Sequence, residues 1–127
     1  MKIYGIGTDI ANIHRIKKNL KNKNFIERLF NKNEIKKCNL QANKANCYAK
    51  RFAAKEAFSK AIGTGISKGI NFNEIVVHNI RSGKPIIKLL GKTKKIVNKN
   101  FKKKRINIFL SLSDDKPFAI ATVVISL

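Results

Sequence analysis

The chain has 127 residues, a length that fits one domain with a buried core and is too short for two. Hydrophobic residues make up 43% of it, so we expect a folded protein, and no apolar run approaches the roughly 18 to 20 residues of a membrane-spanning helix. The first residues lack the apolar core and cleavage site of a signal peptide, so we expect a cytoplasmic protein.

The strongest compositional feature is a net charge of +21, from 28 Lys and Arg residues against 7 Asp and Glu. This excess predicts a polyanionic partner. A small RNA- or ribosome-binding protein is the generic interpretation, but the chain has no Trp and two Tyr for stacking on bases, which disfavours specific nucleic-acid binding. Asn and Ile accompany the lysines, as codon bias in an AT-rich genome would produce, so part of the charge is also explained as a solvated surface.

Cys38 and Cys47 are nine positions apart, and no second pair is present to complete a zinc site. We expect both to be thiols in a reducing compartment and to act as small apolar residues in a helical region. His14 and His78 lie far apart and in no ligand-spaced cluster, so we expect no metal at either.

The first half of the chain predicts one strand and several helices. Residues 3–10 predict a strand, in which Gly5 and Gly7 indicate a bulge or the close approach of another group. Residues 12–20 predict a short basic helix, another helical stretch begins at residue 25, and Asn33 is predicted to cap a turn that begins at residue 34. The longest helix is predicted over residues 43–62, with a stripe of small apolar residues and a stop at Gly63.

The second half predicts mainly strands. Residues 74–80 and 86–89 predict a hairpin, residues 92–101 a short basic helix, 106–113 a strand, 114–117 a turn and 118–125 a buried closing strand. We therefore expect a single α+β domain over residues 1–127, with an antiparallel sheet packed against the long central helix and shorter helices.

Two acidic residues stand out because acids are scarce. Asp9 follows two glycines in a strand, which fits either a carboxylate aimed at a ligand or a capping residue. Glu56 lies one helical turn before Lys60 and is surrounded in sequence by Arg51 and Lys55. A carboxylate beside several cations suits Mg²⁺ with a phosphate ligand, and the alternative is a solvent-facing Glu with an i,i+4 Lys.

Several motifs follow one another in a specific order. These are Gly5-Ile6-Gly7-Thr8-Asp9, then Phe52-x-x-Lys55-Glu56-x-x-x-Lys60, Gly63-Thr64-Gly65, Gly83-Lys84-Pro85, and Ser111-Leu112-Ser113 before the final strand. Alone, each glycine loop is either a phosphate-binding loop or a plain turn. Together, in order over nearly the whole chain except the loosely matching residues 31–48, they closely resemble the holo-acyl-carrier-protein synthases, the small bacterial-type branch of the phosphopantetheinyl transferase superfamily.

The resemblance implies an enzyme that moves the 4'-phosphopantetheine group from coenzyme A to a serine of an apo acyl carrier protein. It implies that Asp9 and Glu56 bind Mg²⁺, that Glu56 or a water it orients takes the serine proton, and that Lys60 stabilises a phosphate oxygen. It also implies a homotrimer whose active sites lie between subunits. The residues it assigns to coenzyme A are Arg51, Lys60, Gly65, Lys84 and Pro85.

The carrier protein is acidic, and the resemblance places its docking surface on and just after the first helix, at Arg15, Lys21 and Arg28, with Lys17 and Lys18 nearby. One departure concerns the position after Ser-x-Ser, where the family usually has a histidine and this chain has Asp114. We interpret Asp114 as a turn residue, with a third carboxylate near the metal as the alternative. The departure also leaves open an inactive relative kept as a binding module.

Overall fold

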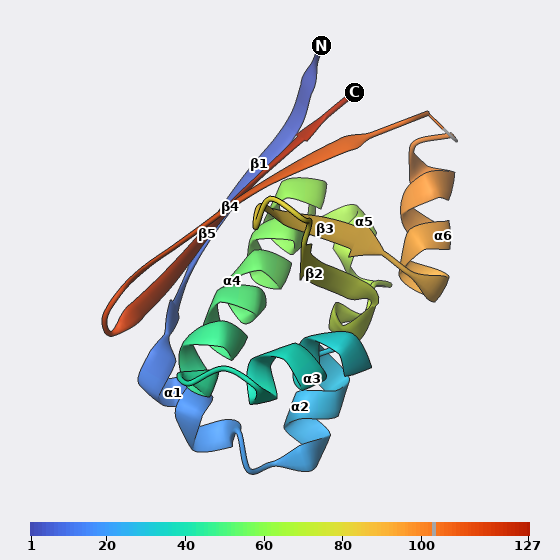
Figure 1. Ribbon diagram of the computed structural model, residues 1–127. Coiled ribbons are helices and arrows are strands. Elements are labelled where there is room, and N and C mark those ends of the chain that lie inside the picture. Colours follow the sequence, from blue (N-terminus) through green and yellow to red (C-terminus); the bar gives the residue numbers. More distant parts are fainter. Residues whose placement is uncertain (103) are drawn as a thin grey trace.

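The computed structural model describes residues 1–102 and 104–127 and contains two antiparallel sheets around one long helix (Figure 1). The larger sheet has the strand order β1-β5-β4, and the smaller is a hairpin of β2 and β3. The strands are β1 (Ile3–Asn12), β2 (Ile75–Asn79), β3 (Pro85–Leu89), β4 (Asn107–Asp115) and β5 (Phe118–Ser126). The helices are α1 (Ile13–Asn19), α2 (Lys23–Leu29), α3 (Lys32–Asn39), α4 (Lys44–Ile62), α5 (Thr64–Ser67), the 3-10 turn η1 (Phe72–Glu74) and α6 (Gly91–Asn100).

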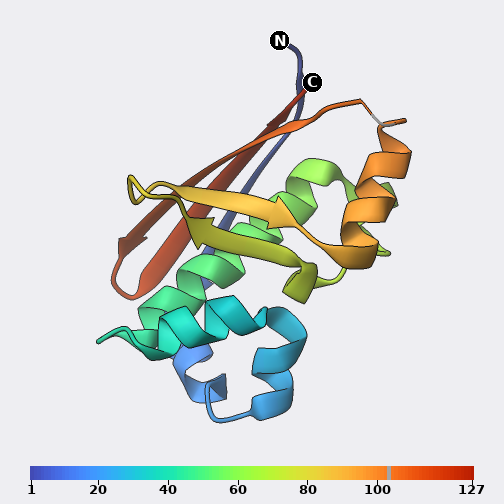
Figure 2. The same cartoon turned by 45° about the vertical axis from the view of Figure 1, so that its right-hand side comes forward.

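Helix α4 lies between the two sheets. Figures 1 and 2 show β1, β5 and β4 passing along one side of α4 and the β2–β3 hairpin along another, while α1, α2 and α3 gather at the end where α4 begins. The predicted single α+β unit with an antiparallel sheet on a long central helix is therefore confirmed. The termini lie close together, since β1 and β5 pair along their whole lengths.

Helix α4 covers nearly the predicted residues and ends at Gly63 as predicted. Its start has a cap that was not predicted, since the Asn43 side chain accepts a hydrogen bond from the backbone N–H of Asn46 at 3.1 Å. Gly63 ends it with a φ of 95°, a conformation that favours glycine. Between them the inner face is built from alanines, of which Ala49, Ala53 and Ala57 are fully buried.

Two glycines of β1 let that strand lie directly against α4. A Cβ atom on Gly5 would come within 2.0 Å of the carbonyl oxygen of Ala61, and one on Gly7 within 1.9 Å of that of Ala57. Both contacts are with main chain, which has no side-chain rotamer to move aside. Of the two predicted alternatives, a bulge or a close approach, both glycines show the close approach, as a backbone-to-backbone contact between β1 and α4.

The short helices at the other end are each capped by asparagine. Asn12 caps α1, Asn22 caps α2, and Asn31 caps α3 together with Glu34 in a capping box. The prediction that Asn33 caps this segment was wrong, because α3 begins earlier and the backbone N–H of Asn33 donates to Asn31 at 2.9 Å. Two asparagines two positions apart give nearly the same cap signal, and only the helix start decides between them.

The prediction of two free thiols was also wrong, because Cys38 and Cys47 form a disulfide. The end of α3 folds back against the start of α4, and this packing brings the two Cα atoms to 5.4 Å, within disulfide range. The expected apolar setting is nevertheless present, since both residues are buried in a cluster with Ile26, Phe30 and Tyr48. We expected thiols because a reducing compartment disfavours disulfides, whereas formation of this disulfide depends on the distance between the two cysteines in the folded chain.

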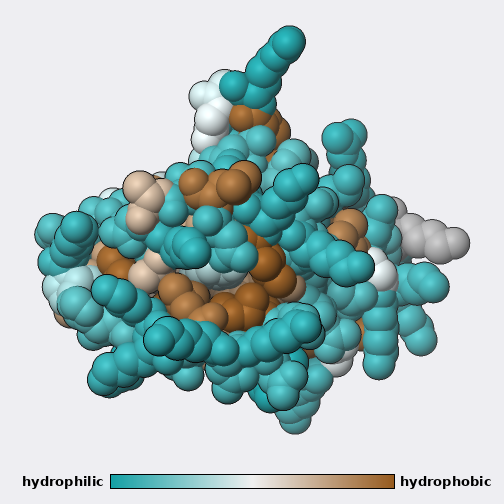
Figure 3. Space-filling view, turned by 60° about the horizontal axis from the view of Figure 1, so that its bottom comes forward, coloured by the Kyte–Doolittle hydropathy of each residue, from teal (hydrophilic) through white to brown (hydrophobic). Residues whose placement is uncertain are grey.

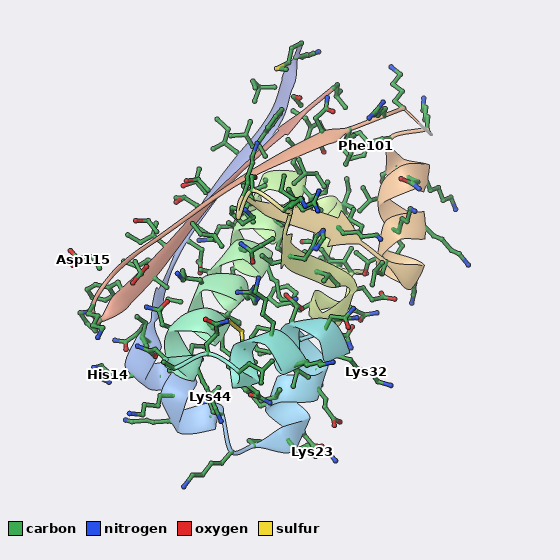
Figure 4. All side chains as sticks on the ribbon, in the orientation of Figure 1. His14, Lys23, Lys32, Lys44, Phe101 and Asp115 are labelled. Atoms are coloured by element: carbon green, nitrogen blue, oxygen red, sulfur yellow. A yellow bond between two sulfur atoms is a disulfide. The ribbon has the colours of Figure 1, made fainter. Side chains whose placement is uncertain are left out.

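One face of the molecule is mainly hydrophilic. Figure 3 shows this face, on which hydrophilic side chains surround a hollow where hydrophobic residues gather, and Figure 4 shows Lys23 and Lys32 extending away from their helices. Over residues 1–102 and 104–127, no helix combines the length and apolar character that crossing a membrane would require.

Candidate active site

Asp9 and Lys60 meet where β1 crosses α4. The Lys60 Nζ donates to Asp9 Oδ1 at 3.0 Å and to the backbone carbonyl of Thr8 at 3.0 Å. The Asp9 side chain is 16% exposed and the Lys60 side chain 55%, so the pair sits at the edge of the packed interface and open to solvent. The close contact of β1 with α4 at Gly7 brings the two side chains together.

Glu56 lies one turn before Lys60 on α4 and is half-buried. Burial raises the pKa of its carboxyl, the Asp9 carboxylate raises this pKa further, and Lys60 opposes both effects. Because the Asp9 and Glu56 charges disfavour each other, a cation between them would be stabilised. Mg²⁺ commonly binds one or two protein carboxylates and takes its other ligands from phosphates and waters.

Asp114 does not join this pair. It lies in β4, and its carboxylate accepts from Asn46 Nδ2 at 2.9 Å and from Lys50 Nζ at 3.4 Å. The hydrogen bond from Asn46 and the charge of Lys50 lower its pKa. The interpretation of Asp114 as a turn residue was wrong, since β4 continues to Asp115, and within the described part of the chain no three His, Cys, Asp or Glu side chains group as metal ligands.

Lys55 was expected to add a cation beside Glu56, and it does not. Its side chain is fully buried on another face of α4, where Nζ donates to Glu34 Oε1 at 2.7 Å, to the Phe72 carbonyl at 2.8 Å and to the Ile75 carbonyl. Burial lowers the pKa of Lys55 to about 8, against the opposing effect of Glu34. Lys55 therefore joins α3, α4 and β2, and the spacing from Lys55 to the buried Phe58 and Ile62 is the signal that indicates this.

Arg51 lies at a separate, cationic cavity of about 540 Å³. The residue is 5% exposed; Nη1 donates to Cys47 Sγ at 3.2 Å and Nη2 to Asn79 Oδ1 at 3.2 Å. Among the described residues the buried Nε has no hydrogen-bond partner. Burial lowers the pKa of Arg51. Lys37, Lys50 and Asn79 also line this cavity, and sequence reasoning missed all three, which carry no motif of their own.

The other predicted coenzyme A residues lie elsewhere. Lys84 is in the exposed turn between β2 and β3, directly before Pro85, the first residue of β3, and the neighbouring Gly83 lines the Arg51 cavity. Gly65 is in α5 and lines a different cavity with Tyr4 and Phe101. Arg51 and Glu56 are five residues apart on α4, a rotation of about 140° around the helix axis, so the single chain presents them on different faces.

The predicted docking residues are all exposed. Arg15 lies on α1, Lys21 follows the C-cap Leu20, and Arg28 lies on α2. Lys17 and Lys18, in the last turn of α1, are exposed as well. These cations belong to α1, α2 and the turn between them, at the end of α4 opposite Lys60.

Comparisons with known proteins find a single family. Residues 5–123 match the model of the 4'-phosphopantetheinyl transferase superfamily. A holo-[acyl-carrier-protein] synthase of Pelagibacter ubique is 52% identical over 125 residues, 98% of each chain. The crystal structure of the holo-[acyl-carrier-protein] synthase of Neisseria meningitidis is similar with a TM-score of 0.84 and 36% identity, covering 98% of this chain and 99% of that one. The synthase of Bacillus anthracis in complex with CoA (3',5'-ADP) is similar with a TM-score of 0.77 and 38% identity, covering 98% and 97%.

Proposed function

This chain belongs to the 4'-phosphopantetheinyl transferase superfamily, and we propose that it is a holo-acyl-carrier-protein synthase that transfers the 4'-phosphopantetheine group of coenzyme A to a serine of an apo acyl carrier protein. The observation that carries the proposal is the cluster of Asp9, Glu56 and Lys60 at the contact of β1 with α4. It combines two anionic ligands with a cation suited to a phosphate oxygen.

We propose that Asp9 and Glu56 hold Mg²⁺. Burial is the main cause of the raised pKa of Glu56, and the nearby Asp9 carboxylate raises it further, which supports a site where two carboxylates lie close together. Two carboxylates fit a metal that takes its remaining ligands from a diphosphate and water. Bound there, the metal would neutralise the diphosphate and assist departure of the leaving group.

The residues of the cluster have separate roles in this proposal. Glu56 accepts the proton of the carrier serine, directly or through a water, as the serine oxygen forms a bond to the β-phosphorus of coenzyme A. The bond from that phosphorus to the bridging oxygen breaks, and adenosine 3',5'-bisphosphate leaves. Lys60 donates to a phosphate oxygen, for which its exposed ammonium is available beside Asp9.

We further propose that a second copy of the chain completes the site, in a homotrimer. Arg51, which we assign with Lys84 and Pro85 to the coenzyme A donor, faces away from Glu56 on α4, so the two groups of residues reach one ligand most readily from two subunits. The outer face of the large sheet supports the assembly. Ile6, Val124 and Phe109 lie in one row across its three strands, and Ile6 is 65% exposed.

The assembly can be tested at this row. We expect the wild-type protein to sediment as a trimer and Ile6→Lys to sediment as a monomer that retains its circular dichroism spectrum, because a charge at the centre of the face opposes its burial. Lys68→Glu, on the exposed loop after α5, is a control that leaves the trimer intact. A monomeric wild-type protein with full transfer activity would contradict the proposal of shared sites.

The activity test is direct. The protein is incubated with apo carrier protein, coenzyme A and Mg²⁺, and the carrier is examined by mass spectrometry for the phosphopantetheine adduct. We expect the adduct with Mg²⁺ and none in excess chelator. Absence of the adduct with several carrier proteins would favour the inactive relative, or the RNA-binding alternative, over the enzyme.

The docking surface gives a second kinetic prediction. We expect Arg15→Glu to raise the KM for carrier protein about tenfold with little change in kcat, because reversing a charge weakens encounter with an acidic partner. Lys32→Glu, equally exposed but on α3, is the matched control. A KM that responds equally to both substitutions would indicate a general effect of net charge and not a docking surface.

A further inference from the structure

Asn79, the last residue of β2, joins three parts of the molecule around the Arg51 cavity. Its Oδ1 accepts from Arg51 Nη2 at 3.2 Å and also from Lys37 Nζ on α3. Its Nδ2 donates to the carbonyl of Gly83 at 2.8 Å, which holds the turn that precedes Lys84. One amide therefore connects α3, α4 and the β2–β3 turn.

Asn79 holds two like charges close together. Lys37 and Arg51 converge on the same oxygen, and burial lowers the pKa of Lys37, with the nearby Arg51 lowering it further. Lys50 lines the same cavity but has Asp114 as a partner at 3.4 Å. The Asn79 oxygen is neutral, so it fixes the direction of two cations without cancelling their charge.

Among the described residues, three cations line the cavity, and two of them share only a neutral acceptor. Lys37 and Arg51 both line it and meet at Asn79, whereas Lys50 is paired with Asp114. An anionic ligand in the cavity would offset the repulsion between Lys37 and Arg51. The cavity is thus built for an anion of the donor substrate, and Asn79 holds its cations in place.

We propose that Asn79 is a positioning residue for donor binding, which orients Arg51 and Lys37 toward the phosphate-bearing adenosine part of coenzyme A and takes no part in the chemical step. The inference rests on the proposed function for the identity of the donor. It assigns Asn79 a role in binding affinity, and it separates that role from the Asp9–Glu56–Lys60 cluster on the other face of α4.

The test compares two substitutions of Asn79 with a control. Asn79→Ala removes the shared acceptor, and we expect it to raise both the KM for coenzyme A and the dissociation constant of adenosine 3',5'-bisphosphate about tenfold. Asn79→Asp keeps an acceptor for both cations but pairs them with a negative charge that repels the ligand, so we expect a larger rise than with Ala. In both variants kcat should stay within about twofold of wild type. Asn73→Ala, an asparagine of η1 outside this cavity, should change none of these quantities.

The outcomes separate positioning from a purely structural role. The proposal is overturned if Asn79→Ala and Asn79→Asp both bind adenosine 3',5'-bisphosphate with the dissociation constant of wild type. It is also overturned if either variant loses kcat while its KM for coenzyme A is unchanged. If Asn79→Ala melts below the assay temperature, its dissociation constant is measured at a lower temperature at which the variant is folded, beside wild type at that same temperature. Calorimetry with adenosine 3',5'-bisphosphate measures binding without any transfer reaction. If the proposed function fails, the wild-type protein binds this nucleotide but modifies no carrier protein, and the test of Asn79 can still be read.

Discussion

Glu56→Gln is expected to lower kcat by about 10²- to 10⁴-fold, the range for loss of a general base, while the melting temperature stays close to that of wild type. Glutamine has the same size, but it cannot accept a proton and is a weaker ligand for a cation than a carboxylate. The measurement is a single-turnover transfer assay, accompanied by calorimetric titration with Mg²⁺ in the presence of coenzyme A. We expect the heat of metal binding to fall together with kcat.

The control for this substitution is Glu27→Gln, which removes an exposed carboxylate whose recorded ion pair is a 3.8 Å contact with Lys23. Full turnover by Glu56→Gln would remove Glu56 from the role of base. The pH dependence provides a second test. Burial and Asp9 raise the pKa of Glu56, so this carboxyl is protonated at a higher pH than an ordinary glutamate. At limiting metal concentration we therefore expect the transfer rate to fall as the pH is lowered, and the fall to begin above the usual pKa range of glutamate.

Glu34→Gln is expected to lower the free energy of unfolding by about 3 to 5 kcal/mol, because it leaves the charge of Lys55 buried without its partner. Both side chains are fully buried, and Glu34 also accepts from the backbone N–H groups of Val77 and Asn31 at 3.0 Å each. Urea denaturation at pH 7 measures the loss. The double variant Glu34→Gln with Lys55→Met should recover part of it, since neither position then carries a buried charge.

Lys55 also predicts a pH dependence with a defined sign. Its pKa is about 8 in the folded protein and near its ordinary value of 10.5 when unfolded, so between these values the unfolded chain binds more protons. The stability of wild type should therefore rise with pH across this interval relative to Lys55→Met. Equal slopes for the two proteins would show that Lys55 does not titrate in this range.

The features that the sequence predicted correctly are those set by local chemistry. The long helix could be bounded because its stripe of small apolar residues begins near residue 43 and Gly63 is a stop, and both signals act within a few residues. The glycines of β1 indicated a bulge or a close approach, but the partner, α4, lies far away in sequence and was not predicted. The Asp9–Lys60 contact lies 51 positions apart in sequence, and only the ordered motifs indicated that these residues belong to one site.

The features that were missed depend on how elements pack. Cys38 and Cys47 form a disulfide because α3 folds back on α4. Lys55 points away from Glu56 and pairs with Glu34, because one residue along a helix rotates the side-chain direction by about 100°. Asn79 belongs to no motif and acquires its contacts only when β2, α3 and α4 meet. For Lys55 a signal existed in its spacing to Phe58 and Ile62, whereas Asn79 offered none.

The main-chain contact at Gly5 and Gly7 has a consequence for how such a protein can change over time. The distance between Asp9 and Glu56 depends on the direct contact between the backbones of β1 and α4. The closest approach of two backbones does not depend on the side chains around them. Replacement of surface and core residues can therefore proceed far in this chain without altering the width of the site. Gly5 and Gly7 thus fix the distance between β1 and α4, and a side-chain atom added at either position would displace β1 together with Asp9.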